Sequence, residues 1–205
     1  MLSRRQLVLG AATILAPPLR PVSAGLSCQD TPYGLQVCTV GVSIPINPAY
    51  QAQLHWCWAA CVEAIFASHN HKVGQERIVE KVFGGDVDQG ALGPQIVAAI
   101  NGTWTGDDGE DTFTANAEVL WDPLFGVGRS DALLQCALDL EADSPLIVGA
   151  IGHANVLTEM TYSAAQVLQL VVLDPYPGNP TRRALSQLEM QNIQFLAKIE
   201  VSDAE

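Results

Sequence analysis

The chain has 205 residues, 48% of them hydrophobic and 16% charged, which excludes a disordered protein and provides enough apolar material for one domain with a sizeable core. Its 22 acidic residues against 10 Lys and Arg give a formal net charge of −12. This acidity argues against nucleic acid and anionic membranes as partners.

Residues 1–24 have the layout of an export signal. Arg4 and Arg5 precede a short apolar run, and the small residues that end at Ala24 provide a cleavage site. The arginine pair resembles a bacterial twin-arginine signal, and an ordinary Sec signal that contains two arginines is the alternative. We therefore expect an exported bacterial protein, periplasmic or secreted, with its domain at 25–205. No later apolar run reaches about 18 residues, so no membrane association is expected once the signal is removed.

Removal of this signal makes the protein more acidic. It takes away three arginines and no acidic residue, which leaves 7 basic against 22 acidic residues and a net charge of −15. A cationic substrate would be attracted over a long range, although the same charge also keeps an exported protein soluble.

All five cysteines follow the signal, and an odd number in an exported protein indicates a free, reactive thiol. If Cys57 is that thiol, a disulfide between Cys28 and Cys38 would close a short N-terminal loop. Cys61 would then pair with Cys136 or stay reduced.

In chain order, a proline- and glycine-containing arm at 25–50 precedes a predicted helix at 56–68. This helix is apolar nearly all round and should be buried, with Cys57 exposed only where it begins in a cleft. The unpaired N–H groups and the positive dipole end of the first turn lower a thiol pKa. Cys57 is therefore a candidate nucleophile, and a buried core thiol is the alternative.

Further helices are predicted from apolar residues at helical spacing, at 75–83, 94–100 and 132–140. His69 and His71 could be metal ligands, but no further ligand stands nearby, so we interpret them as surface histidines. The acidic loop 106–111 lacks the spacing of a calcium site and is interpreted as a solvated loop. No metal or other cofactor is expected.

The second half of the chain is strand-like. Strands are predicted at 146–151, 154–161, 166–173 and 193–201, with a weaker strand signal at 117–121. Helices followed by mostly antiparallel strands favour an α+β fold.

His153 and Asp174 each stand at the end of a predicted strand. If these strands form a hairpin that turns at 162–165, residue 161 pairs with 166 and His153 falls directly opposite Asp174. Opposed side chains lie close enough for the carboxylate to accept a hydrogen bond from one imidazole nitrogen. The other nitrogen would then face Cys57.

Gln51, Cys57 and Trp58 resemble the signature of papain-like cysteine peptidases, in which a Gln lies six residues before a Cys that is followed by Trp. The Cys-Trp-Ala-Ala form is most similar to the bacterial branch, which overlaps with bacteriocin-leader peptidases. The resemblance implies a papain-like α+β fold, with the nucleophile on an N-terminal helix and the base on the facing sheet. It also implies Cys, His and Asp in that chain order, which His153 and Asp174 satisfy.

The same resemblance assigns supporting roles. Gln51 and the Cys57 N–H would form the oxyanion hole, and Gln53 is the competing candidate. Asn155 is the reserve for Asp174 as the residue that orients the imidazole.

These features favour a thiol hydrolase that cleaves peptide or related amide bonds, acting as a monomer on a peptide or protein substrate. One alternative is a transglutaminase-like acyltransferase, which also orders Cys-Trp, His and Asp. Another is a catalytically inactive papain-like binding module, such as an immunity or inhibitor protein. Peptide, isopeptide and peptidoglycan-stem amides all stay open as substrates, because the segment expected to form the pocket walls, 72–125, matches nothing specific.

Overall fold

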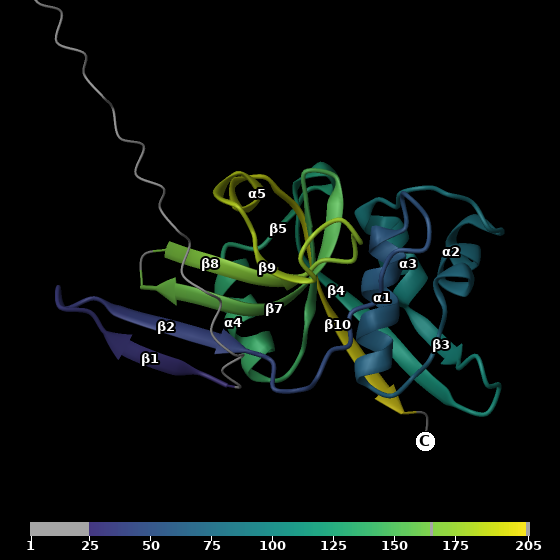
Figure 1. The fold of residues 1–205 in the computed structure, drawn as a ribbon, viewed down its shortest axis with the longest axis horizontal. Coiled ribbons are helices and arrows are strands. Elements are labelled where there is room, and N and C mark those ends of the chain that lie inside the picture. The colour runs from purple at the N-terminus through teal and green to yellow at the C-terminus, as the bar shows by residue number, and fades with distance from the viewer. Residues whose placement is uncertain (1–24, 165, 204–205) are drawn as a thin grey trace, which may run out of the picture.

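The computed structural model describes residues 25–203 with the exception of residue 165 (Figure 1). The export signal predicted at 1–24 lies outside this range. Within the described residues, no helix has the length and apolar character needed to cross a membrane.

Five α-helices occur in this range, together with a short 3-10 helix η1 at Pro123–Phe125. They are α1 (Cys57–Ser68), α2 (Gln75–Phe83), α3 (Gly93–Ile100), α4 (Ala132–Glu141) and α5 (Gln187–Gln191). The four helices predicted from apolar spacing match α1 to α4 within one residue or so at each end. The short α5 was not predicted.

The strands form one antiparallel sheet in the order β1-β2-β7-β6-β10-β4-β3, with β5 on β4 and β9 on β8, which itself pairs with β7. Their bounds are β1 (Ser27–Asp30), β2 (Gln36–Gly41), β3 (Gly102–Thr105), β4 (Thr112–Asp122), β5 (Val127–Gly128), β6 (Leu146–Ala150), β7 (His153–Ser163), β8 (Gln166–Leu173), β9 (Arg182–Ala184) and β10 (Ile193–Asp203). The α+β class is thereby confirmed, with an N-terminal helix that begins at Cys57 and C-terminal antiparallel strands that carry His153 and lead to Asp174.

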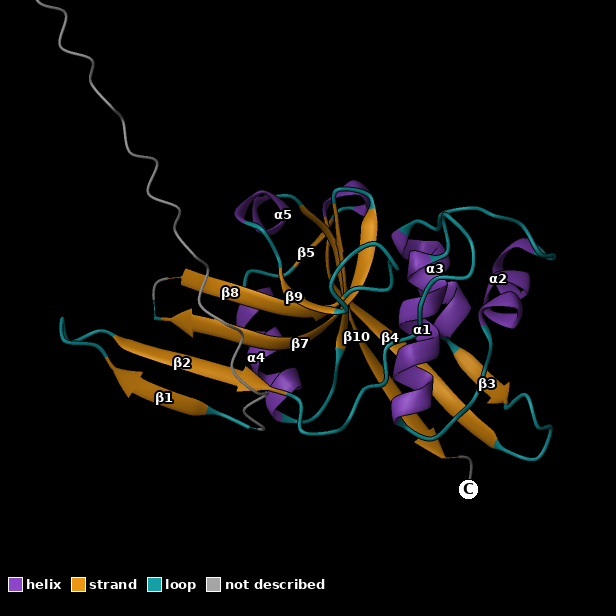
Figure 2. Ribbon diagram, in the orientation of Figure 1, coloured by secondary structure: helices purple, strands orange, loops and turns teal. Residues whose placement is uncertain are grey.

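Two hydrophobic clusters pack on the two faces of this sheet. Consecutive strand residues point to opposite faces, so Ile147 joins the cluster under α1 while its neighbours Leu146 and Val148 join the cluster under α4. Figure 2 shows α1, α2 and α3 gathered at one end of the sheet and α4 apart from them. The α1 helix is apolar nearly all round because it packs against β6 and β7 of this sheet on one side and against α2 on another.

The predicted disulfide between Cys28 and Cys38 is present, and it joins directly opposed residues of the β1–β2 hairpin. The suggested bond between Cys61 and Cys136 is wrong. Both thiols are free and buried, and they belong to different hydrophobic clusters on opposite faces of the sheet. Cys61 therefore stays reduced, as the other reading of the sequence allowed.

His71 is also corrected, because it is buried and not a surface residue. Its Nδ1 lies 2.7 Å from Asp111 Oδ2, and its ring stacks on Phe113 at a centroid distance of 4.0 Å. These contacts attach the 106–111 loop to the core. No group of three or more His, Cys, Asp or Glu side chains that could hold a metal ion occurs in the described part of the chain.

The turn between β6 and β7 contains a strained residue. Ile151 and Gly152 both have positive φ, at 52° and 73°. Such two-residue turns favour Asn-Gly, whereas a β-branched residue is strained in the left-handed region. Ile151→Asn should therefore raise the free energy of unfolding by about 1 kcal/mol, as measured in urea. Ile151→Val keeps the β-branch and should leave the free energy of unfolding unchanged. Equal stabilisation by Ile151→Asn and Ile151→Val would show that the turn conformation is not the cause.

Candidate active site

Cys57 is the first residue of α1, whose N-terminal end carries no side-chain cap. Burial opposes the charged thiolate. Hydrogen bonds from the His153 side chain and from the Ala154 and Trp58 N–H groups, together with the charge of His153, favour it and lower the pKa of Cys57 overall. The uncapped helix start and the paired imidazole thus both stabilise the thiolate form of Cys57.

His153 links Cys57 to Asp174. Its Nε2 lies 2.8 Å from Asp174 Oδ1, so the hydrogen bond with Cys57 falls to the other ring nitrogen, Nδ1. Burial opposes the imidazolium, but the hydrogen bonds and charges of Asp174 and Cys57 outweigh burial and raise the pKa of His153 to about 9. The structure brings the three predicted residues together as an ordered chain of hydrogen bonds.

The route to this contact differs from the predicted hairpin. The β7–β8 ladder runs from Ser163 opposite Gln166 to Val156 opposite Leu173, with two register irregularities between them. His153 pairs instead with Ala150 of β6, and Asp174 lies beyond the end of the ladder. The predicted register is therefore wrong by two to three residues. Asp174 reaches the imidazole from the loop that follows β8, not from a directly opposed position.

Asp174 is fully buried and holds four hydrogen bonds. Besides His153, it accepts from the Tyr176 N–H at 2.9 Å, from Asn179 Nδ2 at 2.8 Å and from Arg183 Nε at 2.6 Å. Burial alone would raise its pKa, but these donors keep the pKa of Asp174 well below its ordinary value. The carboxylate is therefore held as an anion in a fixed orientation beside the imidazole.

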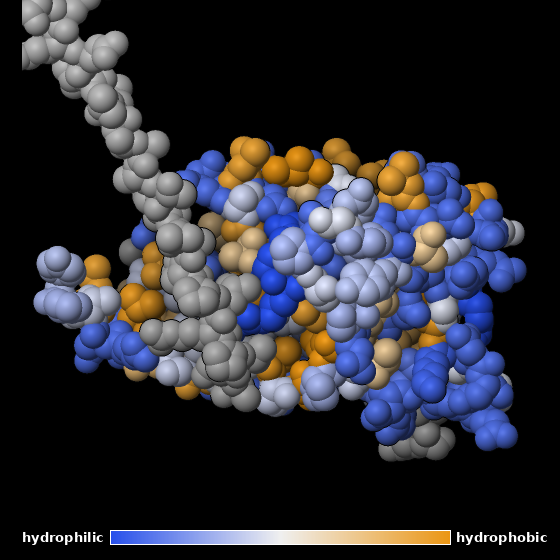
Figure 3. Space-filling model, in the orientation of Figure 1, coloured by the Kyte–Doolittle hydropathy of each residue, from blue (hydrophilic) through white to orange (hydrophobic). Residues whose placement is uncertain are grey.

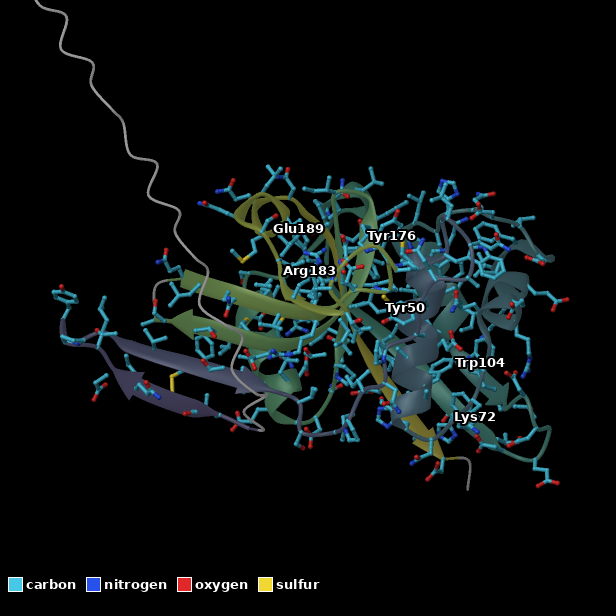
Figure 4. The ribbon with its side chains drawn as sticks, in the orientation of Figure 1. Tyr50, Lys72, Trp104, Tyr176, Arg183 and Glu189 are labelled. Atoms are coloured by element: carbon cyan, nitrogen blue, oxygen red, sulfur yellow. A yellow bond between two sulfur atoms is a disulfide. The ribbon has the colours of Figure 1, made fainter. Side chains whose placement is uncertain are left out.

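Arg183 and Glu189, which lie next to one another in Figure 4, continue this network, and neither was expected from the sequence. Arg183 donates from both terminal nitrogens to Glu189, at 2.8 and 3.1 Å. Glu189 in turn forms a capping box with Ser186 at the start of α5. The Ser-x-x-Glu spacing at 186–189 was the sequence signal for this helix.

Asp174→Ala should lower the free energy of unfolding by about 3 kcal/mol at pH 7, because it leaves the donors of His153, Asn179 and Arg183 without their buried acceptor. The measurement is urea unfolding, with Asp131→Ala as control, since Asp131 pairs with Arg129 at the surface and should matter little. Because the pKa of Asp174 is lowered in the fold, its contribution is present above its ordinary value of 3.8 and is lost as the pH falls further. If the stability difference between the wild-type protein and Asp174→Ala were the same in acid as at pH 7, this charge-based explanation would be wrong.

Gln51 is not arranged as a free oxyanion donor. Its Nε2 donates to the carbonyls of Gln53 and Leu54, at 3.0 and 2.7 Å, so both amide hydrogens are in use. Its buried Oε1 has no hydrogen-bond partner among the described residues. Gln53 contributes its carbonyl to this loop, which places it as a support for Gln51. An oxyanion role for Gln51 requires one of the two bonds to open.

Asn155, the reserve orienting residue, does not contact the imidazole by a hydrogen bond. It is fully buried, and neither of its amide atoms has a hydrogen-bond partner within the described residues. Asp174 therefore occupies the orienting position in this structure.

Cys57 and His153 open into a cavity of about 590 Å³. Its walls include the loop and helix start at 90–96, the turn at 122–125, the strand ends around Gly149 and Phe195, and the segment at 54–58 that carries Cys57. The first two fall within 72–125, the segment expected to supply the pocket walls. Hydrophobic residues reach the surface along the upper edge of the molecule in the view of Figure 3.

The two tryptophans that flank Cys57 fix one of these walls. Trp56 Nε1 donates to the Val87 carbonyl at 2.8 Å, and Trp58 Nε1 donates to the Gln89 carbonyl at 3.2 Å. Both side chains are buried. The loop that leads into the cavity wall at Gly90 is therefore attached directly to the nucleophile segment.

Comparison with known proteins gives only distant likenesses. No protein-family model and no curated protein matches the chain. The peptidase domain of Streptococcus ComA, a bi-functional ABC transporter, is 18% identical with a TM-score of 0.48, over 76% of this chain and 97% of that one. A double glycine motif protease from an AMS/PCAT transporter, solved with the leader peptide, is 14% identical with a TM-score of 0.47, over 80% and 99%. UfSP from C. elegans is 12% identical with a TM-score of 0.49, over 82% of this chain and 34% of that one.

Proposed function

We propose that the protein is an exported thiol hydrolase that cleaves peptide or related amide bonds through Cys57, His153 and Asp174. The observation that supports this most directly is the hydrogen-bond chain from Asp174 through His153 to a sulfur at a helix start, facing a cavity. The pKa of the thiol is lowered and that of the imidazole is raised to about 9, as a thiolate–imidazolium pair requires.

The mechanism begins with attack of the Cys57 thiolate on the amide carbonyl carbon. His153 donates its proton to the leaving amine as the C–N bond breaks, which gives a thioester and a neutral imidazole. His153 then takes a proton from water, the resulting hydroxide attacks the thioester, and the C–S bond breaks to release the acid and the thiolate. Asp174 holds the ring in place and stabilises the imidazolium in both steps.

The oxyanion formed in each step needs hydrogen-bond donors. The Cys57 N–H at the start of α1 is the donor that the helix provides. Gln51 can join it only by releasing the carbonyl of Gln53 or Leu54. Substrate binding that displaces one of these carbonyls would convert Gln51 Nε2 into the second donor.

The test is incubation of the mature protein with a mixed peptide library, followed by mass spectrometry, with and without iodoacetamide pretreatment. We expect new peptide ends that disappear after alkylation. Addition of a primary amine distinguishes the transglutaminase-like alternative, because an acyltransferase would yield amine adducts in place of hydrolysed ends. A Cys57 that is alkylated no faster than a model thiol, with no cleavage, would contradict the proposal and favour an inactive binding module.

A further inference from the structure

Asp122 is a carboxylate placed inside the cavity that contains Cys57. It is the last residue of β4 and is only 4% exposed. Among the described residues that line this cavity it is the sole carboxylate, and the walls around it are mostly apolar, including Leu92, Leu124, Phe125 and Phe195. A buried carboxylate in such surroundings requires compensation by hydrogen bonds or by a cation.

The described part of the protein supplies little of this compensation. Asp122 Oδ1 accepts one hydrogen bond, from the Phe125 N–H at 3.3 Å, at the start of η1. Oδ2 lies against the backbone at Gly93, where a Cβ atom would clash with it, and accepts no hydrogen bond from the described residues. No Lys, Arg or His in the described ranges forms an ion pair with Asp122, in contrast to Asp174 with its Arg183.

The two histidines that share the cavity are already engaged. His153 is bonded to Asp174 and Cys57, and His55 lies 3.2 Å from Asp88. Neither forms an ion pair with Asp122, which leaves Oδ2 available to a cationic ligand in the cavity. The net charge after loss of the predicted signal, −15, would also attract a cationic ligand to this opening.

We propose that Asp122 and the apolar walls beside it form a subsite for a Lys or Arg side chain of the substrate, near the scissile amide. This inference rests on the proposed hydrolase function. The aliphatic stem of the substrate side chain packs on Leu92, Leu124 and Phe125, and its charged head pairs with Asp122 Oδ2. A neutral side chain of the same shape keeps the apolar contacts and loses the ion pair.

The test compares two chloromethyl ketones that differ only in carrying a lysine or a norleucine side chain. Each reacts when the Cys57 thiolate attacks the methylene carbon and chloride leaves, so the rate of labelling reports how well the side chain is bound. In the wild-type protein the lysine reagent should label Cys57 at least ~10-fold faster than the norleucine reagent.

Asp122→Asn should reduce this preference to about onefold, because the amide keeps the shape and the Phe125 hydrogen bond but removes the charge. The matched control is Glu110→Gln, an equal charge change in the exposed 106–111 loop, which should retain the full preference. No preference in the wild-type protein, or a preference that survives Asp122→Asn, would overturn the subsite. An equal loss of both rates in Asp122→Asn would also overturn it and leave Asp122 as a cap for η1.

A second measurement does not depend on a reactive thiol. The Cys57→Ala variant is titrated with n-butylammonium and, separately, with n-butanol, and the amide signals of Gly93 and Phe125 are followed by NMR. Shifts with n-butylammonium and not with n-butanol support the subsite. This holds even if Cys57 proves unreactive, since an unreactive Cys57 would count against the hydrolase function only. Equal shifts with both compounds, or none, would exclude a cation subsite even in an active hydrolase.

Discussion

Cys57→Ala should lower hydrolysis by at least ~10³-fold while the protein keeps its fold, because no other thiol and no hydroxyl or lysine side chain is among the described residues that line the cavity. Cys57 begins α1 with its side chain partly exposed in the cavity, so loss of its sulfur leaves the packing of the helix nearly intact. The measurement is the rate of product formation on the best library peptide, with circular dichroism and urea unfolding to check the fold.

Cys61→Ala is the matched control, since Cys61 lies one turn further along the same helix. Its thiol is fully buried, and burial together with the charges of Cys57 and Asp174 raises its pKa, so it should be unreactive. We expect this variant to keep its activity and lose some stability. Activity that persists in Cys57→Ala and disappears in Cys61→Ala would mean that the nucleophile is wrongly assigned.

The helical half of the protein could be predicted from the sequence because its signals are local. Apolar spacing and the turn residues around it located α1 to α4, and the position of Cys57 at a helix start followed from them. The strands β7 and β8, which are rich in β-branched and large apolar residues, were found for the same reason. These are patterns that a segment carries without reference to its neighbours.

Only the second half of the long β4 strand was predicted, as a weak strand at 117–121, because the inward positions of its first half are hard to recognise. Its buried residues include Ala115 and Ala117, which are small and weakly apolar, and they alternate with polar residues such as Asn116 and Glu118. Their burial depends on β10 and β3 on either side, and a sequence window does not include those partners.

The sequence predicted that Cys57, His153 and Asp174 lie together, but not the geometry that brings them together. A turn at 162–165 placed His153 opposite Asp174, but β7 continues to Ser163, directly opposite Gln166, so the turn is shorter and the register differs by two to three residues from there on. The contact is made from a loop instead. The length of a turn depends on how far the two strands continue to pair, and the residues at 162–165 do not fix that point. The pairing of Asp174 with Arg183 depends on the fold of the 175–181 loop and could not be predicted from the sequence either.

His153→Ala should lower hydrolysis on the order of 10²–10⁴-fold and remove the reactivity of Cys57 in mild acid, because the imidazolium is what favours the thiolate there. The measurement is the rate of iodoacetamide labelling at Cys57 from pH 5 to 9, with the labelled cysteine identified by mass spectrometry. In the wild-type protein fast labelling should begin below the ordinary thiol pKa of 9.0. In the variant it should follow the profile of an ordinary buried thiol.

The same pair predicts how stability depends on pH. The pKa of His153 is about 9 in the folded protein against 6.5 ordinarily, so its charged form stabilises the fold fully below about pH 6.5, and this contribution is lost as the pH rises through about 9. His153→Ala should remove that alkaline loss. His55→Ala, which changes the other histidine of the cavity, should leave both the labelling profile and the alkaline loss unchanged. If His55→Ala abolished acid labelling and His153→Ala did not, the base would have to be reassigned, because the bond between His153 and Asp174 would then serve only the fold.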